Sequence, residues 1–205
     1  MAIVEQMNTS SDSRDHQTKD RIVEAAEHLF KQFGYQKTTV ADIAKKLGMS
    51  SANVYRYFDS KKAINESVAL RLMGEVEQAC RKIAVEPSSA SARLEKLLQT
   101  IHTMNKERYI QDVQMHEMVA AAMRDSWPIV RQHILNIDQI VADLLRQGMA
   151  SGEFVSSDVE LTARCICTSM MRFSHPGLMI ECKDMPLPTL EHMAKFVLRA
   201  LRSGA

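Results

Sequence analysis

Apolar residues between positions 22 and 33 recur with the period of an α-helix, and this pattern constrains the fold more than any other. They fall at spacings of i, i+3, i+4, i+7, i+8 and i+11, and they are Ile22, Ala25, Ala26, Leu29, Phe30 and Phe33. Such spacing places them on one face of an amphipathic helix. Gly34 follows, and glycine commonly ends a helix. The segment is predicted to be a helix with one buried face.

Two shorter helices are predicted directly after this one. Thr39 is a suitable N-cap, and Asp42 stands three residues on, where a capping box places its acid. Between Thr39 and Gly48 the apolar residues again follow a helical spacing, and they are Val40, Ile43, Ala44 and Leu47. Gly48 makes the break, and Ser50 or Ser51 can cap a third helix. A helix followed by two short helices across a glycine-containing turn is a helix-turn-helix.

The third helix carries side chains suited to the major groove of DNA. A recognition helix needs small or polar residues at its start so that it can enter the groove. Ser50, Ser51 and Ala52 meet this requirement. Asn53 can offer its amide to an adenine edge, and Arg56 can reach guanine or a phosphate. We therefore predict base contacts from this helix.

Phosphate contacts are predicted from the residues around it. The phenol groups of Tyr55 and Tyr57 suit phosphate contacts, which fix register without reading sequence. Lys61 stands in the first turn of the next helix, whose backbone N–H groups also attract anions. The alternative is that Tyr55, Tyr57 and Phe58 are core aromatics, and this alternative is favoured for Phe58.

The charge of the chain is unevenly distributed, although its net value is only +1. Residues 13–62 contain ten Lys and Arg against six Asp and Glu, a net charge of +4. Residues 63–205 contain 16 against 17, a net charge of −1. A basic end on a near-neutral body suits phosphate attraction, although basic helices also occur as plain soluble surface.

Length and composition set the remaining limits. A chain of 205 residues can hold one domain, or a small domain beside a larger one. No apolar stretch reaches the roughly 20 residues that a membrane span needs, and residues 1–13 read as a disordered lead-in. Four cysteines without a metal or disulfide framework fit a reducing cytosol. We therefore expect a cytoplasmic protein.

Residues 22–63 resemble the N-terminal domain of the TetR family of bacterial transcriptional regulators. The matching segments are Ala25-Ala26-x-x-Leu29-Phe30, Gly34-Tyr35, Thr38-Thr39-Val40, Ile43-Ala44, Leu47-Gly48-Met49-Ser50, Asn53-Val54-Tyr55-Arg56-Tyr57-Phe58 and Ser60-Lys61. The resemblance implies phosphate contacts from Thr39, Tyr55, Tyr57 and Lys61, and base contacts from residues 50–56. Many members have Gly-Thr where this chain has Ala52-Asn53, so base preference cannot be transferred from them.

The rest of the chain also reads as helices, which gives an all-α fold. The expected helices span residues 61–84, 91–107, 112–124, 127–148, 158–174 and 189–202, and Ser157-x-x-Glu160 is expected to be a capping box. We divide the chain into the lead-in (1–13), a three-helix DNA-binding domain (14–62) and a helical domain (63–205). The resemblance implies that the helical domain dimerises and holds a small-molecule pocket.

The segments 158–174 and 189–202 are the expected dimer interface. Both are apolar around most of the helix, which indicates burial on several sides. Two such helices from each subunit would form the four-helix interface that the resemblance implies. The alternative is that both belong to the core of a monomer. A homodimer also suits recognition of near-palindromic DNA, because its two DNA-binding domains then lie one helical turn of DNA apart.

Candidate pocket residues combine adaptable apolar groups with a few polar ones, as ligand sites do. They are His102, Met104, Tyr109, His116, Met123, Trp127, Met170, Arg172 and Phe173, and His175 is a further polar candidate. Methionine at helical spacing also occurs as plain core. Arg172 can meet an anionic ligand or form an ion pair with a neighbouring acid.

No metal or cofactor is expected. Cys165 and Cys167 stand roughly 200° apart around a helix, so they cannot chelate one ion or form a disulfide there. No two histidines lie three or four residues apart. A metal site made from distant ligands stays open as an alternative, as does thiol sensing by Cys80 or Cys182.

Together these features predict a ligand-responsive DNA-binding transcriptional regulator that acts as a repressor. A small molecule in the body would favour a head separation that no longer matches successive major grooves. The helix over residues 61–84 would carry that coupling. One alternative is an architectural DNA-binding protein without a ligand. The other is an enzyme, which the absence of a nucleophile motif, a glycine-rich phosphate loop and metal-ligand spacing disfavours.

Overall fold

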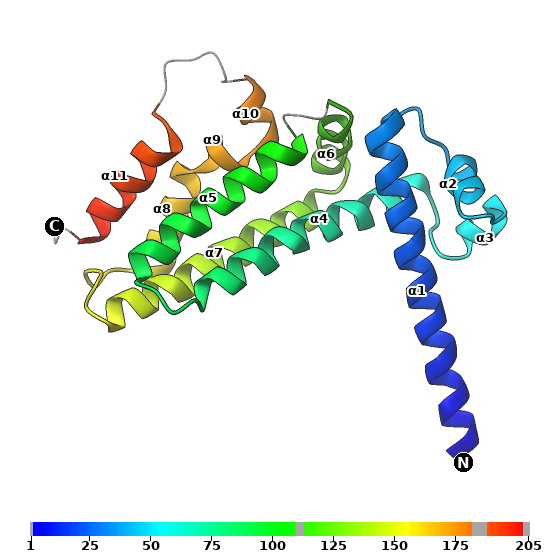
Figure 1. The fold of residues 1–205 in the computed structure, drawn as a ribbon, viewed down its shortest axis with the longest axis horizontal. Helices are drawn as coiled ribbons and strands as arrows, with labels where there is room; N and C mark the ends of the chain where they lie inside the picture. Colours follow the sequence, from blue (N-terminus) through cyan, green and yellow to red (C-terminus); the bar gives the residue numbers. More distant parts are fainter. Residues whose placement is uncertain (1, 110–112, 182–187, 203–205) are drawn as a thin grey trace.

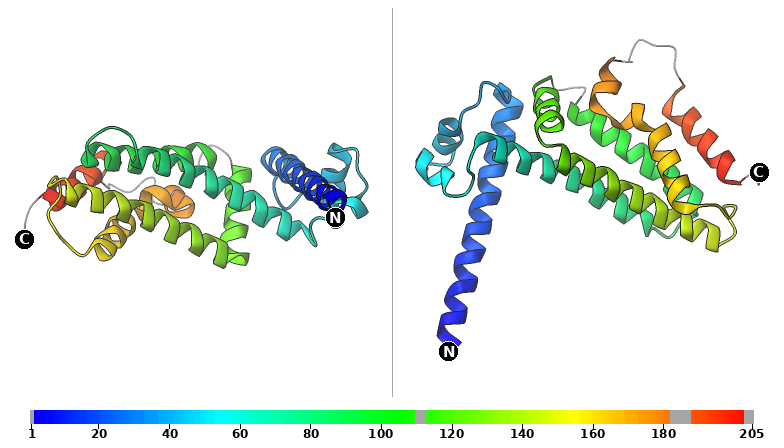
Figure 2. Two further views of the ribbon diagram at one scale, coloured as in Figure 1. Left: turned by 90° about the horizontal axis from the view of Figure 1, so that it is seen from below. Right: turned by 180° about the vertical axis from the view of Figure 1, so that it is seen from behind.

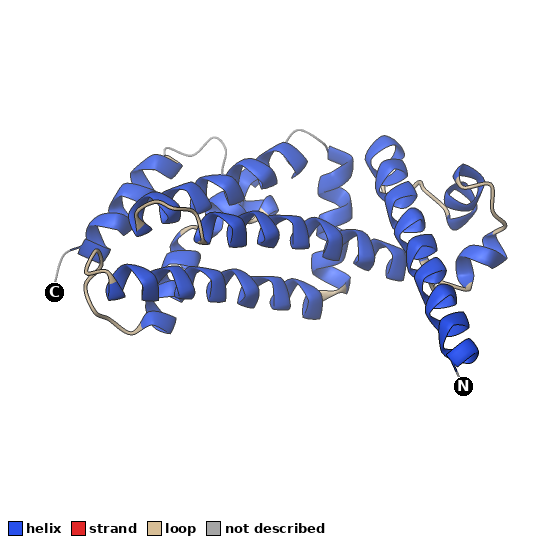
Figure 3. Cartoon of the chain, turned by 60° about the horizontal axis from the view of Figure 1, so that its bottom comes forward, coloured by secondary structure: helices blue, strands red, loops and turns tan. Residues whose placement is uncertain are grey.

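The computed structural model describes the backbone of residues 2–109, 113–181 and 188–202, and the side chains of residues 13–108, 114, 115, 118–179 and 188–202. Regular structure in these residues is entirely helical (Figures 1 and 3), which confirms the expected all-α class. The helices are α1 (Ala2–Phe33), α2 (Val40–Lys46), α3 (Ser51–Tyr55), α4 (Lys61–Ala84), α5 (Ala90–Tyr109), α6 (Val113–Asp125), α7 (Trp127–Ala150), α8 (Val159–Ser169), α9 (Met171–Ser174), α10 (Pro176–Glu181) and α11 (Leu190–Arg202). No described helix is long and apolar enough to cross a membrane.

Helices α1 to α3 and the start of α4 form a small head at one end of the molecule (Figure 1). The predicted stripe of α1 supplies its core, in which Ile22, Ala26 and Phe30 are fully buried. Phe33, at the end of that stripe, is instead 49% exposed. Phe58 is also buried there, as favoured. This core continues to Leu72 of α4, past the boundary drawn at residue 62, because the first turns of α4 pack on α1.

The helix starts of the head follow from local hydrogen bonds. Thr39 and Asp42 form the expected capping box, in which Asp42 Oδ2 accepts from Thr39 N at 2.8 Å and Thr39 Oγ1 accepts from Asp42 N at 3.2 Å. The side chains of Ser50 and Ser60 cap α3 and α4. Gly48 has a φ of +65° in the turn between α2 and α3, a backbone conformation that residues with a Cβ rarely adopt.

The lead-in does not have the disordered structure that we expected, because α1 begins at Ala2. Residues 2–21 contain neither Gly nor Pro, so no helix breaker separates them from the amphipathic stripe. The N-terminal half of α1 extends away from both the head and the body (Figures 1 and 2). Between residues 13 and 21 every side chain except Thr18 is exposed.

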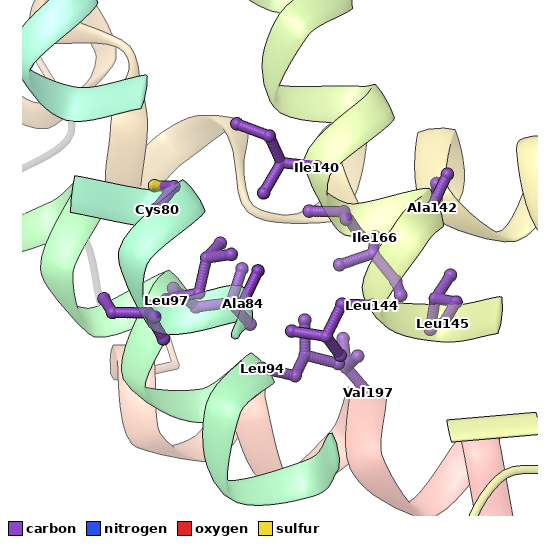
Figure 4. Packing of buried hydrophobic residues seen from close by; sticks show 14 of the residues in the cluster. Cys80, Ala84, Leu94, Leu97, Ile140, Ala142, Leu144, Leu145, Ile166 and Val197 are labelled. Carbon is purple, nitrogen blue, oxygen red and sulfur yellow. The ribbon is translucent and has the colours of Figure 1, made fainter. Parts of the chain in front are cut away.

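The body is built on α4, α5 and α7, which pack along one another, with α8 and α11 completing its core. The buried residues in Figure 4 come from all five helices, and they include Cys80, Leu94, Leu144, Ile166 and Val197. Helix α4 therefore belongs to two cores, the head core at its start and the body core at its end.

Three expectations for the body are corrected. The helix predicted over residues 158–174 ends at Ser169, with Met170 as its C-cap, and α9 follows. Its N-cap is Asp158, whose Oδ1 accepts from Leu161 N at 3.0 Å, whereas Ser157 instead contacts Thr162. Between the expected helices 158–174 and 189–202, where no helix was predicted, Pro176–Glu181 form α10, because proline is tolerated in the first turn of a helix.

Candidate DNA-binding head and ligand cavity

The side chains predicted to contact DNA lie on and around α3. Ser50, Ala52, Tyr55 and Arg56 are exposed, and Ser51 and Asn53 are half-buried. Thr39 lies exposed at the start of α2. The buried Oδ1 of Asn53 has no hydrogen-bond partner among the described residues. The predicted base contacts thus lie on α3 and its two caps, and Thr39 caps the neighbouring helix α2.

Tyr57 has a partner outside the helix-turn-helix. Its hydroxyl donates to Asp15 Oδ1 of α1 at 3.3 Å, and its ring packs partly against the head core. The guanidinium of Arg56 lies 5.9 Å from the centre of the same ring. The ring of Tyr57 therefore packs partly as the core alternative predicts, and the phosphate contact of its hydroxyl stays a prediction.

Lys61 is positioned differently from our expectation. Its ammonium donates to the carbonyl oxygens of Tyr35, Gln36 and Thr38 at 2.9, 3.4 and 3.1 Å. It also lies 4.5 Å from the centre of the Tyr35 ring. Burial lowers the pKa of Lys61. Because an ammonium has three donors, all of them have acceptors within the head, and Lys61 ties the turn between α1 and α2 to α4.

The body contains an apolar cavity of about 230 Å³. Its walls come from α4, α5, α6 and α7, and from the segment between Cys167 and Pro176. Met123, Met170 and Phe173 line it as predicted, and His175 does so too. The cavity lies directly beside the head, since Leu72 belongs both to its wall and to the head core.

Four of the predicted pocket residues lie outside the wall. Met104 packs against the body core, and Trp127 is 53% exposed at the start of α7. His102 Nδ1 lies 2.9 Å from the carbonyl oxygen of Phe173, so it supports the wall from behind. The guanidinium of Arg172 lies 5.6 Å from the centre of the Phe173 ring. The side chains of Tyr109 and His116 lie outside the described residues.

Sequence reasoning missed five polar residues of the wall, which are Asn105, His133, Asp138, Thr168 and Ser174. Two of them, His133 and Asp138, stand on α7. A signal was present, because they interrupt the apolar stripe of α7 at i+3 and i+8 from Val130. The other stripe positions that line the cavity are Ile134, Ile137 and Val141. Polar residues on the buried face of a helix need a partner or a function.

His133 has a buried partner behind the wall. Its Nδ1 lies 2.8 Å from Glu77 Oε1 of α4, and Glu77 also accepts from Asn136 and Arg81 at 2.9 and 3.2 Å. Burial raises the pKa of Glu77, but the hydrogen bonds from these three residues and the charge of His133 outweigh it and hold the pKa below its usual value. Glu77 thereby fixes the His133 ring at the cavity.

Asp138 contacts Cys167 across the cavity wall. Burial, the hydrogen bond to Asp138 and the charge of Asp138 together raise the pKa of the Cys167 thiol. Burial likewise raises the pKa of Cys80 to about 12. Both thiols are therefore held protonated, which leaves them poor nucleophiles. The described side chains contain no group of three His, Cys, Asp or Glu that could hold a metal ion.

A helix-turn-helix head joined through a long helix to an all-helical body is the architecture of a DNA-binding transcriptional regulator. The family described as "Bacterial regulatory proteins, tetR family" matches residues 22–68, and "Tetracyclin repressor-like, C-terminal domain" matches residues 90–191. An uncharacterised HTH-type transcriptional regulator of Mycobacterium tuberculosis is 30% identical over 162 residues, which are 77% of this chain and 75% of the relative. The chain belongs to the TetR family.

Solved structures share the whole fold. FadR from Bacillus subtilis in complex with stearoyl-CoA has a TM-score of 0.62 at 21% identity, covering 90% of this chain and 98% of that one. The SmeT–triclosan complex has a TM-score of 0.65 at 18% identity, covering 90% and 91%. At these identities the likeness establishes the arrangement of helices.

Proposed function

We propose that this regulator represses transcription by binding a near-palindromic operator as a homodimer, and that a small molecule in the cavity releases it. The observation that carries this proposal is the position of α6 between the head core and the cavity. Operator binding also implies that it acts in the cytoplasm. The cavity favours this function over a purely architectural role, which needs no internal site.

Helix α6 presents two adjacent faces, one to the head and one to the cavity. Its head-core residues are Met115, Met118 and Ala121. Its cavity residues are Val119, Ala122 and Met123, and Val119 also packs against the head core. Because packed interfaces shift between discrete arrangements more readily than they deform, a ligand that moves the second face also moves the first.

Contacts of α4 with α6 and with Ser126, the residue directly after α6, extend this coupling to the connecting helix. Asn65 Nδ2 donates to the carbonyl oxygen of Met118 at 3.5 Å, and Ser126 Oγ donates to Glu66 Oε1 at 2.5 Å. The expected route through α4 is thus joined by a route through α6. A ligand that binds the two head orientations with different affinity would shift the population between them.

The DNA contacts that we propose come from the exposed surface of the helix-turn-helix. Base contacts are assigned to Asn53 and Arg56, with Ser50, Ser51 and Ala52 allowing close approach. Phosphate contacts are assigned to Tyr55, Thr39 and Tyr57. The hydroxyls of Thr39 and Tyr57 donate to Asp42 and Asp15 in the DNA-free chain, so DNA would have to replace these partners. Lys61 supports this surface through the loop that it holds, and its ammonium donors are already used within the head.

The dimer interface is assigned to α8 and α11. In the single chain both helices expose large apolar side chains, with Leu161 at 59% and Phe196 at 65% exposure. The opposite faces of both helices pack into the body core, so the exposed apolar groups lie on helices that the core holds in place. Pairing the same faces of two chains would bury them around a two-fold axis.

The direct test is selection of bound duplexes from a random DNA pool with purified protein at a stated salt concentration. Enrichment of a near-palindrome supports a dimeric, sequence-specific regulator, and its half-site spacing gives the distance between the heads. Salt-sensitive binding without enrichment would count against the proposal, because phosphate attraction alone is independent of sequence. A promoter that carries the selected site then tests repression in a transcription assay.

A further inference from the structure

The cavity wall is short of positive charge. Of the described residues that line it, none is Lys or Arg, and Asp138 is the one acidic residue. The carboxylate therefore faces a space lined largely by methionine and aliphatic side chains. A carboxylate in apolar surroundings needs compensation by a donor or an opposite charge.

The compensation that Asp138 receives from the protein is weak. Its contact is the thiol of Cys167, and a thiol is a poor hydrogen-bond donor. No ion pair to Asp138 occurs among the described side chains. Glu77, which lies behind the wall, differs in this respect, because it already pairs with Arg81 and with His133.

The histidines of the wall have other partners. His133 uses Nδ1 for Glu77. His175 Nδ1 accepts from the backbone N–H of Leu178 at 3.3 Å, which is the role of an unprotonated imidazole nitrogen. The guanidinium of Arg172 lies over the Phe173 ring and outside the wall. Among the described side chains of the wall, the carboxylate of Asp138 is therefore an acidic group without an ion-pair partner.

The apolar part of the wall suits the hydrocarbon part of a ligand. Phe173 contributes apolar surface to it, and the guanidinium of Arg172 already lies 5.6 Å from the centre of its ring. The methionines of the wall, Met73, Met123, Met170 and Met171, carry polarizable sulfur atoms that adapt to irregular ligands. A ligand with an apolar body and one cationic group matches both parts of this wall.

We propose that the cavity selects a small lipophilic amine in its protonated form, and that Asp138 is the residue that holds its ammonium group. This inference rests on the proposed function, since it names the chemical class of the effector. It also sets the cavity apart from one that receives a fatty acid or another lipophilic anion, because such an anion would meet the carboxylate without a balancing cation.

The test uses three probes that share one apolar group, namely phenylbutylamine, phenylbutanol and phenylbutanoate. Their binding to the full-length protein is measured by calorimetry at about pH 7, where the amine is charged positively and the acid negatively. The wild-type protein is expected to bind the amine at least about tenfold more tightly than the alcohol, and to bind the acid most weakly.

Two Asp variants locate the effect. Asp138→Asn keeps the size and an acceptor but removes the charge, so it should weaken amine binding about tenfold and change alcohol binding less than about twofold. Asp143→Asn is the matched control on the same helix, because Asp143 is exposed and pairs with Arg146 at 2.6 Å. It should leave all three affinities unchanged. Circular dichroism checks that both variants fold.

Three results would overturn the amine proposal. Acid binding equal to or tighter than amine binding overturns the proposal, as does an Asp138→Asn variant with unchanged amine affinity. Absence of measurable amine binding also overturns it. The DNA selection is carried out without these probes. An enriched palindrome together with no preference for the amine would therefore refute the proposed ligand class and leave the regulator proposal standing. A protein that binds the amine but enriches no sequence removes the regulator proposal instead.

Discussion

The imidazole of His133 on α7 lies 2.8 Å from the carboxylate of Glu77 on α4, which is only 7% exposed. This contact links a cavity-wall residue to the helix that connects body and head. Asn136 and Arg81 complete the set of donors around Glu77. The stability of the body should therefore depend on the ionised form of this carboxylate.

Glu77 predicts an acid-dependent loss of stability. Its folded-state pKa lies below the ordinary value of 4.5, so its contribution is present above about pH 4.5 and is lost as pH falls through the folded pKa. Glutamine has one side-chain oxygen and one NH₂ group, so Glu77→Gln removes one of the two oxygens that accept from His133, Asn136 and Arg81. Glu77→Gln should lower the free energy of unfolding by about 1–3 kcal/mol at neutral pH.

Urea unfolding of the wild type and of Glu77→Gln, measured from about pH 7 down to pH 3, checks this prediction. The difference between the two should shrink as the pH falls, because protonation removes the charge that the variant lacks. A difference that stays constant over this range would show that the ionised carboxylate contributes no more than its protonated form.

Gly148 on α7 is predicted to tolerate no side chain. A Cβ at this position would lie 2.2 Å from Phe154 Cδ2 and 3.0 Å from Ala90 Cβ, and the Phe154 ring is itself buried in the body core. Gly148→Ala should therefore lower the free energy of unfolding by about 1–3 kcal/mol. Thermal or denaturant unfolding provides the measurement.

Gly74 on α4 is the matched control for this substitution. It is also a helical glycine, but a Cβ there would meet no atom within 4 Å. Gly74→Ala should raise the free energy of unfolding by about 0.5–1 kcal/mol, because alanine favours the helix and restricts the unfolded chain. Equal effects of the two substitutions would contradict the packing that places Phe154 against α7.

Lys61 is predicted to act mainly on the stability of the head. Lys61→Ala would leave the carbonyl oxygens of Tyr35 and Thr38 without their donor, which should cost about 1–3 kcal/mol. Lys62→Ala is the control, since Lys62 is more than half exposed and its nearest carboxylate oxygen lies 3.9 Å away. It should change stability by less than about 0.5 kcal/mol. Hydrogen exchange of the residues in α1 and α2 localises the effect.

The dimer proposal predicts that a charge at Phe196 separates the subunits. Phe196 on α11 is 65% exposed in the single chain, so Phe196→Glu should disturb the body core little but would bury a charge in the proposed interface. Light scattering after size exclusion should show a dimer for the wild type and a monomer for the variant. The control Val85→Glu, at a position that is 77% exposed beyond the end of α4, should leave the dimer intact.

The parts of the fold that the sequence predicted are those that depend on local chemistry. The starts of α2 and α4 depend on Thr39 and Ser60, whose side chains bond backbone N–H groups a few residues away. The core face of α1 follows from its periodicity alone. The break at Met170 was missed because the apolar residues of that segment continue through it without a glycine or proline.

The cavity was harder to predict because its lining depends on how helices face one another. Phe173 lines the cavity while the adjacent Arg172 does not, and periodicity alone does not say which of two neighbours turns inward. His133 and Asp138 were missed for the same reason, since only the packing of α7 against α4 and α8 shows that their stripe faces a space. Lys61 was assigned to DNA because its acceptors lie more than twenty residues away in the sequence.

The last prediction separates sequence reading from phosphate contact on α3. Asn53→Ala should relax the preference at one position of each selected half-site and cost about 1–3 kcal/mol on the preferred operator. Tyr55→Phe removes a hydroxyl from a side chain that is 49% exposed, and it should weaken binding to all duplexes by a similar factor. Selection and fluorescence anisotropy at one fixed salt concentration measure both effects. If Tyr55→Phe altered the selected sequence, or Asn53→Ala weakened every duplex equally, the two assignments would have to be exchanged.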